Sequence, residues 1–448
     1  MLKRKITEEL IKWKENQLLK KKALLIKGLR QIGKTFIIRD FARKHYKYEV
    51  YIDFKRNSEL KTIFDGDFSV DRILMDLSAK IVGLKFVPHE TVIIFDEIQE
   101  CANARTALKY FVDDGRYDVI ASGSLLGIRG YNKKKSRGVP TGSEHIIYMH
   151  PLDFEEFLWA KGVSEEVICY LKECFESRKP ISKVTHESLL RYFKEYICVG
   201  GLPEAVNIFL KTGNLNLVYQ EQRDILEEYK DDFGKHLNEE ENEEVDEKLL
   251  VKILEVFNSI PSQLAKENKK FQYSWIKKSA RASEYIKAIQ RLKEFGIISQ
   301  CYNLSNLQKP LVGNEIDNIF KIYMRDSGLF IAMLDKGTAG EIISGNLGIY
   351  KGAIFENIVA DSFSKMDRNL YYFEKDSGLE IDFVTTYKNE VTLIEVKAKT
   401  GNTKSSKTIL NNYSTYNVKK CIKLGEYNIG ESDNILTIPY YLAFLLKE

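Results

Sequence analysis

The sequence lacks paired cysteines and long apolar runs. Its six cysteines stand apart along the 448 residues and none belongs to a Cys-x-x-Cys pair, so no zinc site of that type is predicted. Scattered thiols in so long a chain favour a reducing compartment. No run reaches the roughly eighteen apolar residues of a membrane span, and the basic first residues lack the apolar stretch of a secretory signal. We therefore expect a cytoplasmic protein without a membrane partner.

The sequence also carries little net charge. Lys and Arg number 68 against 64 Asp and Glu, which leaves +4. This balance neither requires nor excludes nucleic acid as a partner, because such binding depends on local patches of charge and not on the net charge. No internal repeat or low-complexity tract occurs, and 44% hydrophobic with 29% charged residues is ordinary for globular domains. The length predicts roughly two to four domains.

The first 150 residues alternate between short apolar runs and helical patterns. Residues 6–20 read as a basic amphipathic helix. The apolar runs predict strands at 23–26, 49–54, 91–95 and 118–121, and the helical patterns between them lie at 36–45, 69–81 and 104–113. Strands that alternate with helices predict a mostly parallel sheet covered on both faces.

The second part of the chain changes pattern twice. From residue 151 it becomes helical, and the acidic run at 239–247 predicts a linker. Helices expected at 249–259, 273–279 and 283–295 precede a strand at 297–302, an order that resembles a winged helix-turn-helix. A helix is expected at 320–334. From residue 348, a helix followed by several strands predicts a second α/β unit.

One segment carries the signature of a phosphate-binding loop. Residues 28–35 fit Gly-x-x-x-x-Gly-Lys-[Ser/Thr] between a predicted strand and a predicted helix. Its glycines let backbone N–H groups surround phosphate at a helix N-terminus. Lys34 is expected to reach the β- and γ-phosphates of ATP, and Thr35 to place its hydroxyl on Mg²⁺. The residues predicted to bind nucleotide here are Gly28, Arg30, Gln31, Gly33, Lys34 and Thr35.

A second motif strengthens this prediction. The apolar run at 92–95 ends in Asp96 and Glu97, at the end of a strand where α/β proteins place ligands. Asp96 is expected to hold Mg²⁺, and Glu97 to act as the general base on the attacking water. For the two acids alone, an ordinary helix start is the alternative.

Further polar residues follow the fourth predicted strand. Ser122 or Ser124 could sense the γ-phosphate, and a helix N-cap is an equally good interpretation. Arg129 and Arg137 lie in a basic loop, where either could act as an arginine finger in trans. A solvated loop, or one that touches a polyanion, is the commoner interpretation.

The phrases GLRQIGKT, IIFDEIQE, IASGSLLG, HPLDFEEFLWA and VGGLPEAV resemble a large prokaryotic group of AAA-type ATPases. Later phrases, including FKIYMRDSGLF, GAIFENIVA and TLIEVKAK, extend the resemblance over nearly the whole chain. It implies a C-terminal domain of unknown function with a restriction-endonuclease-like fold. Relatives often carry Gly-Arg before the PLDFEEF phrase, where this chain has Thr141-Gly142-Ser143, so an arginine role there is not implied.

The C-terminal unit contains a second candidate centre. Asp382 and Glu395 lie on neighbouring predicted strands, and alternation puts Glu395 and Lys397 on one face. The three resemble the PD-(D/E)XK nuclease signature. Asp382 and Glu395, with Glu356 from the preceding helix, would bind Mg²⁺ through oxygen, and Lys397 would orient water or neutralise phosphate. The alternatives are a surface ion-pair pattern and an inactive binding module.

The expected fold class is α/β. It combines a P-loop NTPase parallel sheet (1–160), a helical lid (161–247), a winged-helix-like middle domain (248–347) and an endonuclease-like α/β domain (348–448). Basic residues near 277–293 could contact DNA or RNA, or the winged helix could dock protein. The leading interpretation is an ATP-hydrolysing switch that acts on nucleic acid. The alternative is a signalling or toxin–antitoxin-type interaction ATPase, which self-associates or binds another protein and whose last domain is catalytically inactive.

Overall fold

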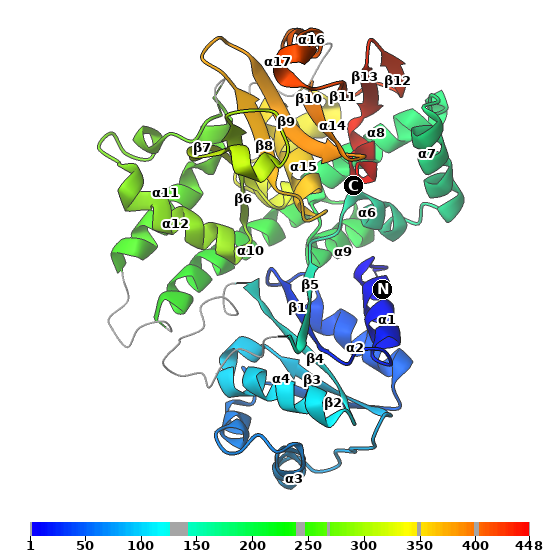
Figure 1. Ribbon diagram of the computed structural model, residues 1–448, viewed down its shortest axis with the longest axis vertical. Coiled ribbons are helices and arrows are strands. Elements are labelled where there is room, and N and C mark those ends of the chain that lie inside the picture. Colours follow the sequence, from blue (N-terminus) through cyan, green and yellow to red (C-terminus); the bar gives the residue numbers. More distant parts are fainter. Residues whose placement is uncertain are drawn as a thin grey trace.

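The computed structural model describes residues 2–125, 142–238, 247–266, 269–346, 351–397 and 403–447. They form a lower body around a five-stranded sheet and an upper body around an eight-stranded sheet, as Figure 1 shows. The chain passes from the lower to the upper body after β5 (Glu144–Met149). The acidic run at 239–246 and both arginine-finger candidates, Arg129 and Arg137, lie outside the described residues.

The lower sheet is parallel throughout, with strand order β2-β3-β4-β1-β5. Alternate residues of its strands enter two separate cores. Leu24 and Ile94 pack with α1 and α2, whereas Leu25 and Ile93 pack with α3 and α4. The predicted parallel sheet with two covered faces is therefore confirmed. The elements are α1 (Ile6–Asn16), β1 (Ala23–Gly28), α2 (Lys34–His45), β2 (Tyr48–Asp53), α3 (Val70–Lys80), β3 (Thr91–Asp96), α4 (Ala102–Asp114) and β4 (Asp118–Ser124).

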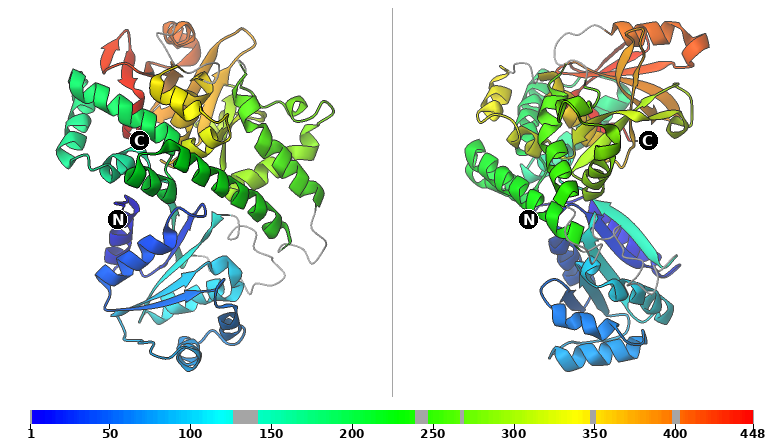
Figure 2. Two further views of the ribbon diagram at one scale, coloured as in Figure 1. Left: turned by 180° about the vertical axis from the view of Figure 1, so that it is seen from behind. Right: turned by 90° about the vertical axis from the view of Figure 1, so that its left-hand side faces the viewer.

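Five helices follow β5 and begin the upper body. The first, α6, starts with a capping box in which Asp153 and Glu156 satisfy each other's backbone N–H groups. The last, α10, lies across the junction of the two bodies (Figure 2). The helices are α6 (Phe154–Ala160), α7 (Glu165–Ser177), α8 (Lys183–Val199), α9 (Pro203–Thr212) and α10 (Leu215–Asn238).

The upper sheet is mixed, with strand order β12-β13-β11-β10-β9-β8-β6-β7. The strands β6 and β7 form an antiparallel pair, and β6 also pairs in parallel with β8. The expected boundary between 347 and 348 thus divides strands of one continuous sheet. The strands are β6 (Ile298–Leu304), β7 (Glu315–Met324), β8 (Leu370–Glu374), β9 (Glu380–Tyr387), β10 (Glu390–Val396), β11 (Lys420–Gly425), β12 (Gly430–Ser432) and β13 (Ile435–Pro439).

Helices flank this sheet. They are α11 (Glu247–Leu264), α12 (Ala282–Phe295), α13 (Ser327–Ala332), α14 (Thr338–Ser344), α15 (Lys351–Ser364), α16 (Lys404–Asn411) and α17 (Tyr413–Tyr416), with 3-10 segments η3 (Tyr273–Trp275) and η5 (Tyr440–Leu445). None of the described helices is long and apolar enough to cross a bilayer.

Two predicted helices were wrong. Residues 320–334 form the end of β7 and then α13, because the aromatic and β-branched residues of 319–323 complete a ladder with β6 and Asp326 caps a new helix. The helix expected at 273–279 is reduced to η3. The strands β5, β7, β12 and β13 were not predicted.

Candidate functional site

The phosphate-binding loop joins β1 to α2 at the carboxyl edge of the lower sheet. Gly28 packs so closely on β5 that a Cβ atom there would lie 2.4 Å from the Met149 carbonyl oxygen. Gly33 adopts φ 86°, a left-handed conformation that glycine allows. Lys34 is buried, and its Nζ donates to the carbonyl oxygens of Leu29 at 2.7 Å and Gly28 at 3.2 Å. Burial lowers the pKa of Lys34 to about 8, against the opposing effect of Glu97 and Asp96.

Asp96 is the centre of a hydrogen-bond network at the loop. Its Oδ2 accepts from the hydroxyls of Thr35 and Tyr51, both at 2.7 Å. Its Oδ1 accepts from the Ser122 hydroxyl and, at 3.2 Å, from the Glu97 backbone N–H. Strands β2, β3 and β4 are neighbours, which brings Tyr51, Asp96 and Ser122 together, and Thr35 joins them from the start of α2. The sequence had not indicated Tyr51, whose strand carries no motif.

The remaining predicted residues lie beside this network. Ser124 is buried at the end of β4, in register with Gly28 of the neighbouring strand. Glu97 has φ 51° and ψ 48°, a left-handed conformation that is strained for a residue with a side chain. Its carboxylate accepts from the Gln99 amide, and its charge raises the pKa of Lys34. The acid next to the motif aspartate thus faces the phosphate-binding lysine.

Helix α10 of the upper body contacts the loop. Asp232 of α10 forms an ion pair with Arg30, and Glu228 accepts from the Gln31 amide. The Tyr229 hydroxyl donates to the Arg30 carbonyl oxygen at 3.1 Å. These contacts join parts of the chain about two hundred residues apart, so the sequence could not place α10 here.

A buried arginine near the N-terminus also contacts the loop. Arg4 donates to the carbonyl oxygens of Ile32 at 3.2 Å and His150 at 2.5 Å, and to the Glu156 carboxylate at 3.2 Å. It therefore connects the phosphate-binding loop with the crossing segment between the two bodies. No motif marked Arg4 in the sequence.

The donor set around Asp96 suits a nucleotide-bound Mg²⁺. A carboxylate and a hydroxyl, Asp96 and Thr35, are the oxygen ligands that Mg²⁺ prefers, and they lie within hydrogen-bond distance of each other beside Lys34. Tyr51 donates to the same Asp96 oxygen as Thr35 and Ser122 donates to the other oxygen, so both fix the orientation of the carboxylate. The predicted nucleotide residues thus converge at one edge of the sheet.

The second candidate centre lies on the antiparallel pair β9–β10. Asp382 Oδ2 accepts from the Val396 N–H at 2.7 Å, and Lys397 Nζ lies 3.7 Å from that oxygen while forming an ion pair with Glu395. Ser406 also donates to Glu395. Burial raises the pKa of Asp382 to about 7, and Glu356 adds to the shift. The three residues named for this centre therefore meet on one face of the hairpin.

Glu356 has other partners. It forms an ion pair with Lys269 and accepts from the Tyr323 hydroxyl at 3.1 Å. Lys321, which is fully buried, interacts with the charge of Glu356 and donates to Glu380 at 3.0 Å. Within the described part of the chain, no three His, Cys, Asp or Glu side chains group as a metal site would require. Any metal here would rest on Asp382 and Glu395.

Three regions of the chain match known families. Residues 20–158 match the family described as AAA domain. Residues 190–339 and 351–442 each match a domain of unknown function, DUF8612 and DUF4143 respectively. The middle and last families carry no described activity.

Individual relatives are distant. The chain is 27% identical over 223 residues to the uncharacterized protein MJ1544 of Methanocaldococcus jannaschii, a match that spans 48% of this chain and 42% of that protein. Among solved structures, the Aeropyrum pernix ORC2 protein in its ADPNP–ADP complexes is 12% identical, with a TM-score of 0.34, over 76% of this chain and 92% of that chain. The AMPPCP-bound DnaA of Aquifex aeolicus is 10% identical, with a TM-score of 0.28, over 66% and 89%.

At these identities and scores, the identification rests on the family match and on the loop itself. The matched range, 20–158, includes the phosphate-binding loop, Asp96 and the five strands of the parallel sheet. Residues 20–158 therefore match the AAA domain family and carry a phosphate-binding loop on a parallel α/β sheet.

Proposed function

We propose that this protein binds and hydrolyses ATP at residues 28–35, and that it uses the nucleotide to switch the contact between its two bodies. The observation that carries the proposal is the network around Asp96, in which Thr35 and Ser122 meet one carboxylate beside Lys34. A nucleotide site that had lost its function would have no need for Lys34, Thr35, Asp96 and Ser122 together.

Each residue has a defined part in the proposed reaction. Lys34 exchanges its carbonyl partners for the β- and γ-phosphate oxygens, and backbone N–H groups of the loop donate to the same phosphates. Thr35 and Asp96 would hold Mg²⁺, which supplies neutralisation of the phosphate charge. Water attacks the γ-phosphorus, the bond to the β–γ bridging oxygen breaks, and Glu97 takes the proton from the water. The products are ADP and inorganic phosphate.

The contacts of α10 support a switch. Arg30 and Gln31 belong to the loop that must surround the phosphates, and both are held by α10. A nucleotide that reorders the loop changes these contacts, and the helix transmits the change to the upper body. The test is phosphate release by the wild type and the Lys34→Ala variant. Wild-type protein that neither binds nor hydrolyses ATP would overturn the proposal.

The target of the switch is proposed to be nucleic acid. The support is the series of exposed basic residues that leads into and along α12, Lys277, Lys278, Arg281 and Lys287. Such residues bind phosphates without sequence preference. Binding of labelled DNA and RNA, with and without ATP, tests this part separately from hydrolysis.

A metal-dependent nuclease at Asp382, Glu395 and Lys397 is a second candidate activity. Two observations support it. The two carboxylates and the lysine lie together on one hairpin, and the pKa of Asp382 is raised to about 7. The opposite interpretation, an inactive binding module in an interaction ATPase, is supported by the lysines that already neutralise the carboxylates. Cleavage of single- and double-stranded DNA and RNA with Mg²⁺ or Mn²⁺ decides between them, with Lys397→Ala as the control.

A further inference from the structure

Arg4 lies between the phosphate-binding loop and the upper body, and each nitrogen of its buried guanidinium group has its own acceptor. Nε donates to the Glu156 carboxylate at 3.2 Å, Nη1 to the Ile32 carbonyl oxygen at 3.2 Å, and Nη2 to the His150 carbonyl oxygen at 2.5 Å. Arginine suits this place because its planar group presents donors in several fixed directions, which the single ammonium of lysine does not.

The contact with Ile32 fixes one peptide unit of the loop. The Ile32–Gly33 bond is trans, so the carbonyl that faces Arg4 and the Gly33 N–H point in opposite directions. None of the described residues accepts from that N–H, and Gly33 is the N-cap of α2, where a helix end favours an anion. The contact therefore turns the Gly33 N–H away from the arginine and leaves it open to a phosphate oxygen.

The other end of this connection is the first helix of the upper body. Glu156 is the third residue of α6, where its Oε2 accepts from the Asp153 N–H at 3.0 Å and completes the capping box. Its Oε1 accepts from Arg4 and, at 2.7 Å, from the Lys5 N–H. One carboxylate thus caps α6 and holds the arginine that contacts the loop.

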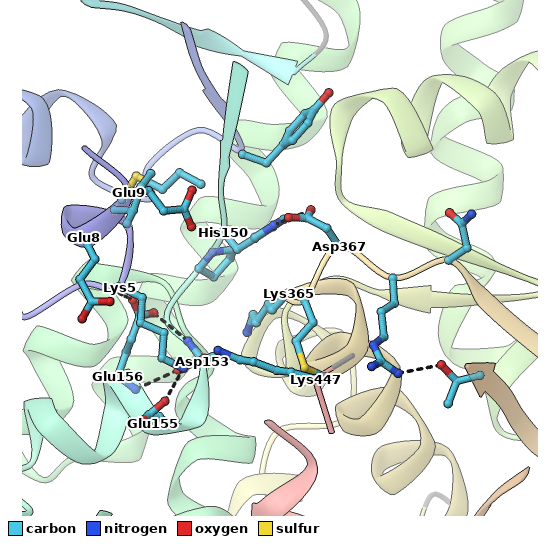
Figure 3. Close-up of a pocket in the computed structure, with 18 of the residues that line it drawn as sticks. Lys5, Glu8, Glu9, His150, Asp153, Glu155, Glu156, Lys365, Asp367 and Lys447 are labelled. Atoms are coloured by element: carbon cyan, nitrogen blue, oxygen red, sulfur yellow. Dashed lines mark hydrogen bonds and ion pairs between the residues drawn. The ribbon is translucent and has the colours of Figure 1, made fainter. Parts of the chain in front are cut away.

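The residues on either side of the arginine also bind the upper body. Lys5 forms ion pairs with Asp153 and Glu155, and Figure 3 shows these side chains together on the wall of a hollow of about 990 Å³ between the two bodies. Lys3 forms an ion pair with Glu165 of α7. Three successive basic residues therefore attach the N-terminal segment to α6 and α7.

The helix that follows belongs to the lower body. Helix α1 begins at Ile6, and its buried residues share one core with those of α2, the helix that the loop enters. The loop thus has two sets of contacts toward the upper body. One set joins Arg30 and Gln31 to α10, and the other joins Ile32 through the N-terminal segment to α6.

We propose that Arg4 is a positioning residue for the nucleotide, which presents the Gly33 N–H to the phosphates of ATP and ties that orientation to α6 through Glu156. Arg4 acts through the peptide unit and not on the phosphate itself. The inference rests on the proposed ATP site, and it adds a second route by which the state of the loop reaches the upper body.

The test is steady-state phosphate release at increasing ATP concentration, with thermal melting of the same full-length proteins. Arg4→Gln removes the charged group, whereas Arg4→Lys keeps a cation beside the buried Glu156, which protects the fold, but cannot hold both carbonyl oxygens. Both variants should raise KM for ATP about tenfold, as expected for the loss of one hydrogen bond to a charged group. The value of kcat should stay within about threefold, because Lys34 and Glu97 are unchanged.

Two further variants separate the route to α6 from a general effect. Glu156→Gln keeps the capping box, since glutamine also serves at this position, and weakens the contact with Arg4, so KM should rise about threefold although the residue lies in the upper body. Lys3→Gln is the matched control. Its ion pair with Glu165 is exposed and does not reach the loop, so its kinetics should equal those of the wild type.

Each outcome decides a point. A raised KM in both Arg4 variants and in Glu156→Gln supports the inference. A lower kcat or melting temperature with an unchanged KM would show that Arg4 is merely structural and would overturn the inference. Wild-type kinetics of Glu156→Gln would overturn the connection to α6. Wild-type kinetics of both Arg4 variants would overturn the whole inference and leave ATP hydrolysis standing, whereas a wild type that neither binds nor hydrolyses ATP would overturn the proposed function and the inference with it.

Discussion

Asp232 of α10 forms an ion pair with Arg30, two positions after the first glycine of the phosphate-binding loop. The pair connects the phosphate-binding loop directly with a helix of the upper body. Asp232 is 8% exposed, so the arginine beside it is held in a largely desolvated position. This contact, together with those of Glu228 and Tyr229, connects the phosphate-binding loop with the upper body.

We expect Asp232→Ala to uncouple the two bodies. The change leaves Arg30 without its carboxylate, which costs about 3 kcal/mol for a buried pair. ATP affinity should change at least threefold and the unfolding temperature should fall, as measured by titration calorimetry and by thermal melting. Asp231→Ala, at the exposed neighbouring position, is the control and should leave both unchanged. Equal behaviour of the two variants would contradict a coupling role.

Two substitutions in the nucleotide site should separate ATP binding from ATP turnover. Lys34→Ala should abolish ATP binding, because it removes the buried ammonium proposed to contact the β- and γ-phosphates. Glu97→Gln should keep binding and lose hydrolysis by about a hundredfold or more, because the amide cannot accept the proton of the attacking water. Fluorescent-nucleotide binding and phosphate release measure the two effects. Hydrolysis by Glu97→Gln at the wild-type rate would show that the base lies elsewhere.

ATP affinity should fall at alkaline pH. The pKa of Lys34 is about 8 in the free protein, and phosphate oxygens favour the charged ammonium, so the pKa rises on binding. Affinity is then full below pH 8 and falls as pH rises above it, by about tenfold between pH 7.5 and pH 9. Titrations over this range measure the slope. Lys34→Arg should bind with no such slope, since its side chain stays charged.

Tyr51 should contribute to the site through its hydroxyl. Tyr51→Phe removes one of the groups that orient Asp96 and keeps the ring that packs on Arg39. We expect a loss of about 1 kcal/mol, or about fivefold, in ATP turnover. Steady-state phosphate release checks it, and unchanged thermal stability would localise the effect to the site.

Lys269 should compete with a metal at the second centre. Lys269→Gln removes the cation paired with Glu356, so affinity for Mn²⁺ should rise about tenfold. Titration calorimetry with Mn²⁺ measures this, and Lys277→Gln, an exposed lysine of the same region, is the control. An unchanged affinity would favour the interpretation of the last domain as an inactive module.

The lower sheet and its loop were predictable because their signals are local. The motif at 28–35 joins one strand to one helix, and β1, β3 and β4 carry apolar runs, while β2 alternates; β5 also carries an apolar run, at 146–149, which was not interpreted as a strand. Residues 320–334 were misread because a short apolar stretch has no period long enough to separate helix from strand, and pairing with β6 decided the outcome. The predicted bounds of the helices differ from the observed ones by a few residues, because an apolar period does not mark the residue at which a helix ends.

The sequence by itself determined the chemistry of the nucleotide site, since Lys34, Thr35 and Asp96 lie at positions that any parallel sheet of this order brings to one edge. Only the tertiary structure decided what surrounds that site. Tyr51, Arg4 and Asp232 reach it through contacts between separate elements, and Arg325 lines a hollow that exists only where two bodies face each other. Contacts of this kind depend on packing between distant segments, which no local pattern of residues encodes.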